Sequence, residues 1–185
     1  DMGGVMPVVK HMPGHGRATV DSHDELPRID SDRDTLRQSD FQPFKQLNDA
    51  LLGMTGHLLF SAIDEVAVST CSKTVIGDII RSHIGFDGVL MSDDISMSAL
   101  AGDMRARVTG ALKAGCDMVL HCNGAMAEMQ AIAEILPSKP SIDAAPRIAR
   151  VDEALATLQS DVPKSARKVW QEIMADIFPE SQNAL

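Results

Sequence analysis

Short apolar runs alternate with longer helical patterns along most of this chain. The runs 5–9, 54–61, 88–92 and 117–122 are largely aliphatic and contain β-branched residues, so they predict four buried strands. Apolar residues also recur at helical spacing. The predicted helices cover 44–51, 72–84, 100–114, 129–136, 148–158 and 169–177.

Sequence signals mark several ends of these predicted elements. Ser72 is a suitable N-cap for the second helix, and Gly85 and Gly115 are suitable stops for the second and third. The segment 24–39 is dense in charged residues, contains Pro27 and has no apolar period, so it predicts an irregular surface loop.

Four successive strand-then-helix units with nearly all-apolar strands predict a parallel sheet covered by helices. Polar side chains follow the strands, as in α/β barrels, whose sites lie at the carboxyl ends of the strands, so a barrel is favoured over an open doubly wound sheet. A full barrel needs eight units and about 250 residues. We therefore expect half of a (β/α)8 barrel, forming one domain over 1–185 with C-terminal helices in 138–185, and a chain that is a piece of something longer.

Composition narrows the class of protein. The 185 residues are 44% hydrophobic and 23% charged, which is ordinary for a globular protein, and the net charge of −9 argues against a nucleic-acid partner. Neither an apolar run of about 20 residues nor a leader pattern is visible, so we expect no membrane association and a cytoplasmic location. Cys71, Cys116 and Cys122 lack metal-ligand spacing and are expected to be reduced thiols.

Candidate chemistry concentrates just after the first predicted strand. Residues 10–23 contain one lysine, three histidines and one aspartate, and Pro13, Gly14 and Gly16 end regular structure there. The segment is therefore a polar loop at a strand end, where α/β folds carry their chemistry.

Asp93 and Asp94 follow the third strand. Successive strand side chains point to opposite faces, so only one of the two carboxylates can face the mouth of a barrel, and the other would cap a helix or accept hydrogen bonds. His57 is consistent with either a site residue or a packed one, and His15 is expected to shape the glycine loop.

A metal site is an alternative function for the loop, because His11, His15, Asp21 and His23 are ligand types close together in sequence. The intervening Pro-Gly prevents a helix, so the fixed i, i+4 geometry of zinc proteases is absent. We therefore expect neither a metal nor a cofactor.

Several ordered motifs resemble one known family. They are KHMPGHG at 10–16 followed by DSH at 21–23, MTGH at 54–57, GFDGVLMSDDISM at 85–97 and AGCDMVL at 114–120. These motifs are similar to those of the bacterial β-N-acetylglucosaminidases of glycoside hydrolase family 3, the group that acts in peptidoglycan recycling. The resemblance implies a (β/α)8 barrel and places this chain in the C-terminal half of the family's chain, as barrel strands five to eight.

The resemblance also implies roles for individual residues. Asp93 matches the nucleophile of a retaining glycosidase, and His23 matches the general acid/base with Asp21 as its orienting partner. An imidazole titrates near neutral pH, and a carboxylate two residues away can fix its tautomer. Lys10 and His11 match residues that hold sugar hydroxyls. Met97, with Ser96, matches a position near the acetamido group.

The activity implied is removal of terminal GlcNAc from muropeptide fragments such as GlcNAc-1,6-anhydroMurNAc peptides. Phosphorolysis is an alternative, because a histidine repels an anionic acceptor less than a glutamate would. Another is an inactive half-barrel that self-associates or pairs with the missing N-terminal half through its open sheet edges. A family 3 β-glucosidase fits less well, because such enzymes lack the Asp-Ser-His loop.

Overall fold

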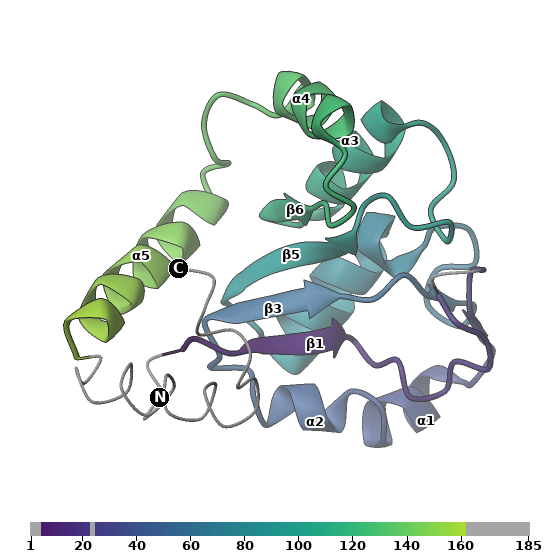
Figure 1. Ribbon diagram of the computed structural model, residues 1–185. Helices are drawn as coiled ribbons and strands as arrows, with labels where there is room; N and C mark the ends of the chain where they lie inside the picture. Colours follow the sequence, from purple (N-terminus) through teal and green to yellow (C-terminus); the bar gives the residue numbers. More distant parts are fainter. Residues whose placement is uncertain (1–4, 23–24, 162–185) are drawn as a thin grey trace, which may run out of the picture. The chain divides into compact units, whose positions relative to one another are not determined.

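The computed structural model describes residues 5–22 and 25–161, with side chains described as far as 158 (Figure 1). The chain divides into two compact units. One is Pro7–Val151, and the other is Asp1–Met6 with Asp152–Leu185, of which residues 5–6 and 152–161 are described. The sheet and the candidate site belong to the first unit. The expected helix over 169–177 lies outside the described residues, and the division into domains stays a prediction.

Strands and helices alternate along the described chain. In order they are β1 (Val8–Met12), β2 (Arg28–Ile29), α1 (Arg33–Gln38), α2 (Gln42–Lys45), β3 (Leu52–Thr55), β4 (Leu59–Phe60), the 3-10 helix η1 (Ser69–Cys71), the π-helix η2 (Val75–Ile84), β5 (Val89–Asp94), α3 (Met104–Ala114), β6 (Met118–Leu120), α4 (Met126–Ile135) and α5 (Ala144–Asp161).

The main sheet is parallel throughout and has the strand order β1-β3-β5-β6 (Figure 1). The order advances in one direction along the chain, as in the wall of a barrel, whereas a doubly wound sheet reverses direction. The α/β fold with a parallel sheet is therefore confirmed. A separate pair, β2 and β4, is also parallel and joins Arg28 to Leu59 and Ile29 to Phe60.

One hydrophobic core lies between the sheet and its helices. Leu90 of β5 belongs to a single buried cluster with Ile76, Ile79 and Ile80 of η2 and Val108 of α3. These η2 residues and Val108 were among the apolar positions that define the predicted helices, so that part of the pattern indicates the core correctly.

Three predicted helix ends are confirmed. The Ser72 hydroxyl accepts a hydrogen bond from the Val75 N–H at 3.1 Å, as an N-cap does. Gly85 after η2 has φ of 81°, and Gly115 after α3 has φ of 119°, which is the left-handed region that favours glycine.

The stretch from 24 to 61 differs from the prediction. The expected loop over 24–39 contains β2 and α1, because Asp32 caps α1 and Leu36 is fully buried. The expected helix over 44–51 is limited to α2, which ends at Lys45. The single strand expected over 54–61 is two short strands, β3 and β4. The strand expected over 5–9 is β1, which lies about three residues later than predicted and therefore contains Lys10 and His11.

Replacing Asp32 with alanine should lower the free energy of unfolding, as the loss of an N-cap side chain does. The Asp32 carboxylate accepts hydrogen bonds from Asp34 N at 3.0 Å and Thr35 N at 2.9 Å, so its loss leaves two N–H groups of α1 without their acceptor. Urea unfolding measures the change. Asp34→Ala is the matched control, since that side chain is 81% exposed and makes only a 3.8 Å ion pair with Arg37. An equal loss in both variants would contradict the capping role.

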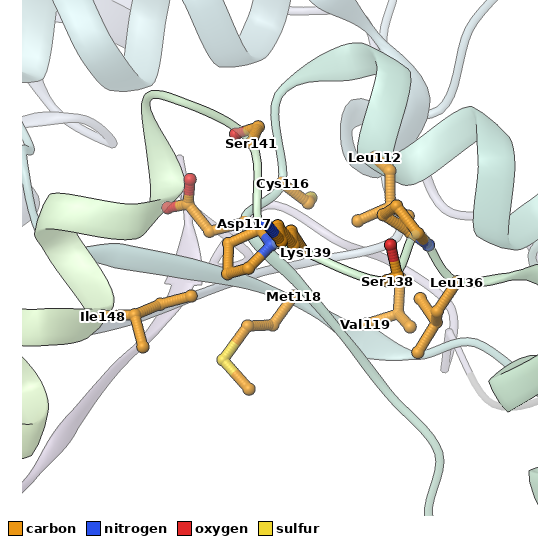
Figure 2. A pocket seen from close by; sticks show the side chains of 12 residues that line it. Leu112, Cys116, Asp117, Met118, Val119, Leu136, Ser138, Lys139, Ser141 and Ile148 are labelled. Atoms are coloured by element: carbon orange, nitrogen blue, oxygen red, sulfur yellow. The ribbon is translucent and has the colours of Figure 1, made fainter.

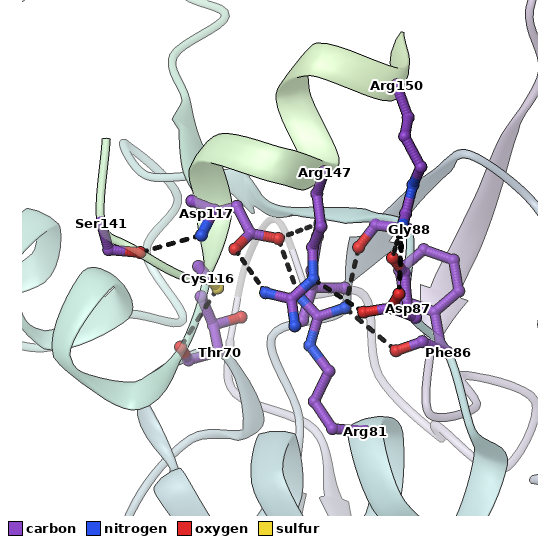
Figure 3. A network of polar contacts seen from close by, with 12 residues as sticks. Thr70, Arg81, Phe86, Asp87, Gly88, Cys116, Asp117, Ser141, Arg147 and Arg150 are labelled. Atoms are coloured by element: carbon purple, nitrogen blue, oxygen red, sulfur yellow. Dashed lines mark hydrogen bonds and ion pairs between the residues drawn. The ribbon is translucent and has the colours of Figure 1, made fainter. Parts of the chain in front are cut away.

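A buried ionic network holds the amino end of β6 (Figure 3). Asp117 accepts hydrogen bonds from Arg81 of η2 at 2.7 Å and from Arg147 of α5 at 3.0 Å. Its side chain is only 3% exposed, and its Oδ2 also accepts the Leu90 N–H at 2.9 Å. Arg81 additionally donates to the carbonyls of the Phe86–Gly88 turn before β5. One carboxylate therefore joins two strands and two helices.

Candidate active site

The carboxyl ends of β1 and β5 bring a histidine and a carboxylate together. His11 Nε2 lies 3.5 Å from Asp93 Oδ2, although the two residues are far apart in sequence and their strands are separated by β3. Their side chains are 29% and 17% exposed, so both are accessible but partly desolvated. Burial lowers the pKa of His11, although the nearby Asp93 charge acts in the opposite direction. A neutral His11 can therefore offer a hydrogen bond at this strand end.

Asp93 and Asp94 have different surroundings. Asp93 Oδ1 accepts the Asp94 N–H at 2.9 Å, and its Oδ2 is the oxygen near His11. Asp94 accepts instead from the N–H and the hydroxyl of Ser96, at 3.0 and 2.8 Å, and from the Cys122 N–H at 3.2 Å. Burial alone would raise the pKa of Asp94, but these hydrogen bonds lower it below its ordinary value. Asp94 thus holds the loop after β5, whereas Asp93 faces His11.

The loop after β1 folds back on itself. His15 Nε2 lies 3.3 Å from the hydroxyl of the buried Ser22, and the His15 ring lies 5.6 Å from that of His11. Arg17 ties the loop to the end of α1 through Asp40, at 2.7 Å. Asp21 is exposed on this loop next to Ser22, whereas His23 lies outside the described residues.

The other sequence-predicted residues occupy nearby positions. Lys10 is exposed on β1 next to His11, and the two are joined by a cis peptide bond. Met97 lies in the loop after β5, with a side chain that is 93% buried, since its exposed fraction is 7%. This loop depends on a residue that the sequence analysis did not single out: one nitrogen of Arg107 donates to the carbonyls of Ile95, Ser96 and Met97.

His57 belongs to a buried chain of polar groups that ends at the backbone of Asp94. It is fully buried, with Nε2 2.9 Å from the Asp94 carbonyl and Nδ1 2.8 Å from the Thr70 hydroxyl. Burial lowers the pKa of His57, so the ring is neutral near pH 7. Thr70 was also missed. It carries no motif by itself, and only the fold brings η1 beneath the end of β3.

Described residues of the first unit line cavities beside the sheet. One, of about 340 Å³, opens beside the loop after β1 and is lined by Lys10, His11, Gly14, His15, Gly16, Asp40, Pro43 and Phe44. Another, of about 310 Å³, lies near the amino end of β6 between α3, the 136–141 segment and α5 (Figure 2). Asp117 in the wall of this second cavity is paired with arginines, whereas the first cavity adjoins Lys10 and His11.

Two features bear on metals and membranes. Within residues 5–22 and 25–161, no cluster of three histidine, cysteine or carboxylate side chains is arranged to hold a metal ion. In the same part of the chain, no helix combines the length and the apolar composition that a membrane span requires.

The fold and the strand-end side chains define an α/β protein with a polar site at the carboxyl edge of a parallel sheet. Residues 2–157 match the model of the glycosyl hydrolase family 3 N-terminal domain. The chain belongs to this family.

Individual proteins are also similar to this chain. The chain is 44% identical over 124 residues to a beta-hexosaminidase of Alkalilimnicola ehrlichii, which covers 65% of this chain and 35% of the relative. It is 38% identical over 177 residues to a beta-hexosaminidase of Chromobacterium violaceum, and this match covers 94% of this chain and 46% of the relative. Among solved structures, NagZ from Neisseria gonorrhoeae in complex with N-trifluoroacetyl-D-glucosamine has a TM-score of 0.68 and 27% identity, covering 94% of this chain and 50% of that one.

The family match corrects one expectation. The resemblance placed this chain in the C-terminal half of the family's chain, and that placement is wrong, because the matching model describes the N-terminal domain. Which barrel strands the sheet represents stays a prediction. The chain spans less than half the length of the two beta-hexosaminidases.

Proposed function

We propose that this chain carries catalytic groups of a retaining β-N-acetylglucosaminidase. The observation that supports this most directly is the 3.5 Å approach of His11 Nε2 to Asp93 Oδ2 at the strand ends of a family 3 sheet. The relatives named beta-hexosaminidase support the reaction, and the Neisseria gonorrhoeae neighbour bound to an N-acylated glucosamine supports the sugar.

In the proposed reaction, Asp93 attacks the anomeric carbon of the terminal sugar. The Asp94 N–H holds Oδ1 of Asp93, which leaves Oδ2 to form the glycosyl ester. His23 donates a proton to the leaving oxygen in this step. It then removes a proton from the water that hydrolyses the ester, with Asp21 orienting its imidazole.

Sugar binding is assigned to Lys10, His11 and Met97. Lys10 and His11 lie beside the 340 Å³ cavity and would donate hydrogen bonds to ring hydroxyls. Met97, nearly buried in the loop that Arg107 holds, would contact the acetamido methyl group. The proposed substrate is a muropeptide fragment with terminal GlcNAc, such as a GlcNAc-1,6-anhydroMurNAc peptide, cleaved by hydrolysis.

Within the family's N-terminal domain, the four strands of the main sheet are proposed to occupy the positions of barrel strands five to eight. The outer strands β1 and β6 expose apolar side chains, Val8 at 37% and Met118 at 47%. Unpaired strand edges and exposed apolar residues favour pairing with further strands. We propose that the remaining strands of the family domain, or a second copy of this chain, supply them.

The acid/base role of His23 is tested by the dependence of the rate on the leaving group. His23→Ala should lower kcat by about 10³-fold on a GlcNAc disaccharide, whose leaving oxygen needs a proton. On 2,4-dinitrophenyl N-acetyl-β-glucosaminide the loss should be smaller, because that phenolate leaves unprotonated. Initial rates of the two substrates measure this, and NMR of the first-formed product should show the β anomer.

His15→Ala is the matched control, since His15 lies in the same loop and should lose activity equally on both substrates. Absence of turnover in the wild-type chain, or equal losses on both substrates in His23→Ala, would contradict the assignment. Formation of a sugar phosphate in phosphate buffer would identify the reaction as phosphorolysis.

A further inference from the structure

We propose that His57 is a positioning residue that fixes the Asp93 carboxylate through the backbone of Asp94. This inference rests on the proposed function, since Asp93 is the nucleophile only there. From the sequence, His57 is consistent with either a site residue or a packed one.

The hydrogen bonds define which tautomer His57 adopts. A carbonyl oxygen only accepts, so Nε2 must carry the proton that it shares with Asp94 at 2.9 Å. In the neutral ring Nδ1 then accepts from the Thr70 hydroxyl at 2.8 Å. Thr55 completes the chain, with its hydroxyl 2.8 Å from that of Thr70. All three side chains are fully buried, so none of these bonds competes with bulk water.

The Asp94 peptide groups connect this chain to the nucleophile. The Asp94 carbonyl accepts a hydrogen bond from His57 Nε2, and the Asp94 N–H donates a hydrogen bond to Oδ1 of Asp93 at 2.9 Å. The Asp94 side chain is fixed as well, through Ser96 and the Cys122 N–H. With Asp94 fixed in this way, the Asp93 carboxylate has one oxygen anchored and the other directed toward His11.

The helix η1, which carries Thr70, is itself hydrogen-bonded to the backbone on both sides of His57. The Ser69 hydroxyl of η1 donates to the Gly56 carbonyl and accepts the Leu58 N–H at 3.2 Å. The segments on both sides of His57 are therefore tied to η1. A histidine present only for packing would not need a hydrogen bond at each ring nitrogen, and an apolar side chain could fill the same space.

The test compares His57→Ala with His57→Gln. Glutamine can place an amide N–H near the position of Nε2 and donate to the Asp94 carbonyl, whereas alanine leaves that carbonyl without a donor. His83→Gln is the matched histidine control, because His83 lies on η2 and packs against Phe41 instead. Folding of each variant is checked by circular dichroism.

Two readouts are measured on the full chain. The first is hydrolysis of 4-nitrophenyl N-acetyl-β-glucosaminide, where His57→Ala should lower kcat by about 100-fold with KM nearly unchanged. The second needs no activity: the NMR chemical shift of the Asp93 side-chain carboxyl carbon at neutral pH, assigned by its loss in Asp93→Asn. This signal should move in His57→Ala, return in His57→Gln and stay unchanged in His83→Gln.

The two proposals fail in different ways. If the wild-type chain hydrolyses no glycoside, the proposed function fails, and the Asp93 carboxyl signal alone decides the role of His57. If His57→Ala leaves the Asp93 signal unchanged, the positioning role is overturned, even where kcat falls. If His57→Gln fails to restore the signal in a folded variant, the hydrogen bond to Asp94 is not the cause, which also overturns the positioning role.

Discussion

Replacing Asp93 with alanine should lower kcat on 4-nitrophenyl N-acetyl-β-glucosaminide by at least about 10⁴-fold. The proposed mechanism needs a carboxylate at this position to form the glycosyl ester. The adjacent carboxylate, Asp94, has both oxygens engaged by Ser96 and Cys122. The measurement is a steady-state rate comparison between wild type and variant.

Two controls separate lost chemistry from lost structure. Asp94→Asn keeps a carbonyl oxygen for the Ser96 and Cys122 N–H groups, so its kcat should fall far less than that of Asp93→Ala. Adding azide to Asp93→Ala should restore turnover, since a small anion can attack the anomeric carbon in the space that the carboxylate leaves. A greater loss in Asp94→Asn than in Asp93→Ala would contradict the choice of nucleophile.

Replacing Asp117 with alanine should cost about 3–5 kcal/mol of unfolding free energy. The variant leaves Arg81 and Arg147 facing each other without the carboxylate between them, and both guanidinium groups are only 17% exposed. It also removes the acceptor of the Leu90 N–H at the centre of the sheet. Urea unfolding followed by circular dichroism measures the change.

Asp87 provides the matched control for this network. It pairs with Arg147 and Arg150, but its side chain is 67% exposed, so water can replace the lost contacts (Figure 3). Asp87→Ala should therefore cost less than about 1 kcal/mol. Comparable losses in the two variants would show that burial of Asp117 does not determine its contribution.

The sequence predicts the parallel sheet because its strands are signalled locally. The strand β6 lies inside the predicted run 117–122, and β5 extends only two residues beyond the predicted run 88–92. Ser72, Gly85 and Gly115 mark helix ends by local hydrogen bonding or backbone conformation. Each of these signals involves residues at most a few positions apart. Such signals remain readable without knowledge of the fold.

The region 24–61 was mispredicted because tertiary contacts decide it. The helix α1 has a single buried apolar residue, Leu36, so its period cannot be recognised among charged residues. The helix α2 ends early although Leu47 continues its pattern, and Leu47 is 49% exposed. An apolar residue that remains exposed gives the same periodicity as one that is buried.

The candidate site was predictable only where side chains sit at strand ends. Asp93 and His11 are each predicted as site residues, and they lie close together because parallel strands end at one edge of the sheet. Thr70 and Arg107 could not be predicted, because their contacts with His57 and with the carbonyls after β5 depend on how η1 and α3 pack. The structure does not test the roles of Asp21 and His23, which stay predictions.

Arg107 has a consequence for how this site could diversify. Its guanidinium reaches from α3 to three consecutive carbonyls at the start of the loop and, through Nε, to Gly102 near its end. The loop is thus clamped at both ends, while Ser98 and Ala101 between them are exposed. Insertions or exchanges at those exposed positions leave the clamp in place, which makes this loop a suitable graft point for new side chains beside the candidate site.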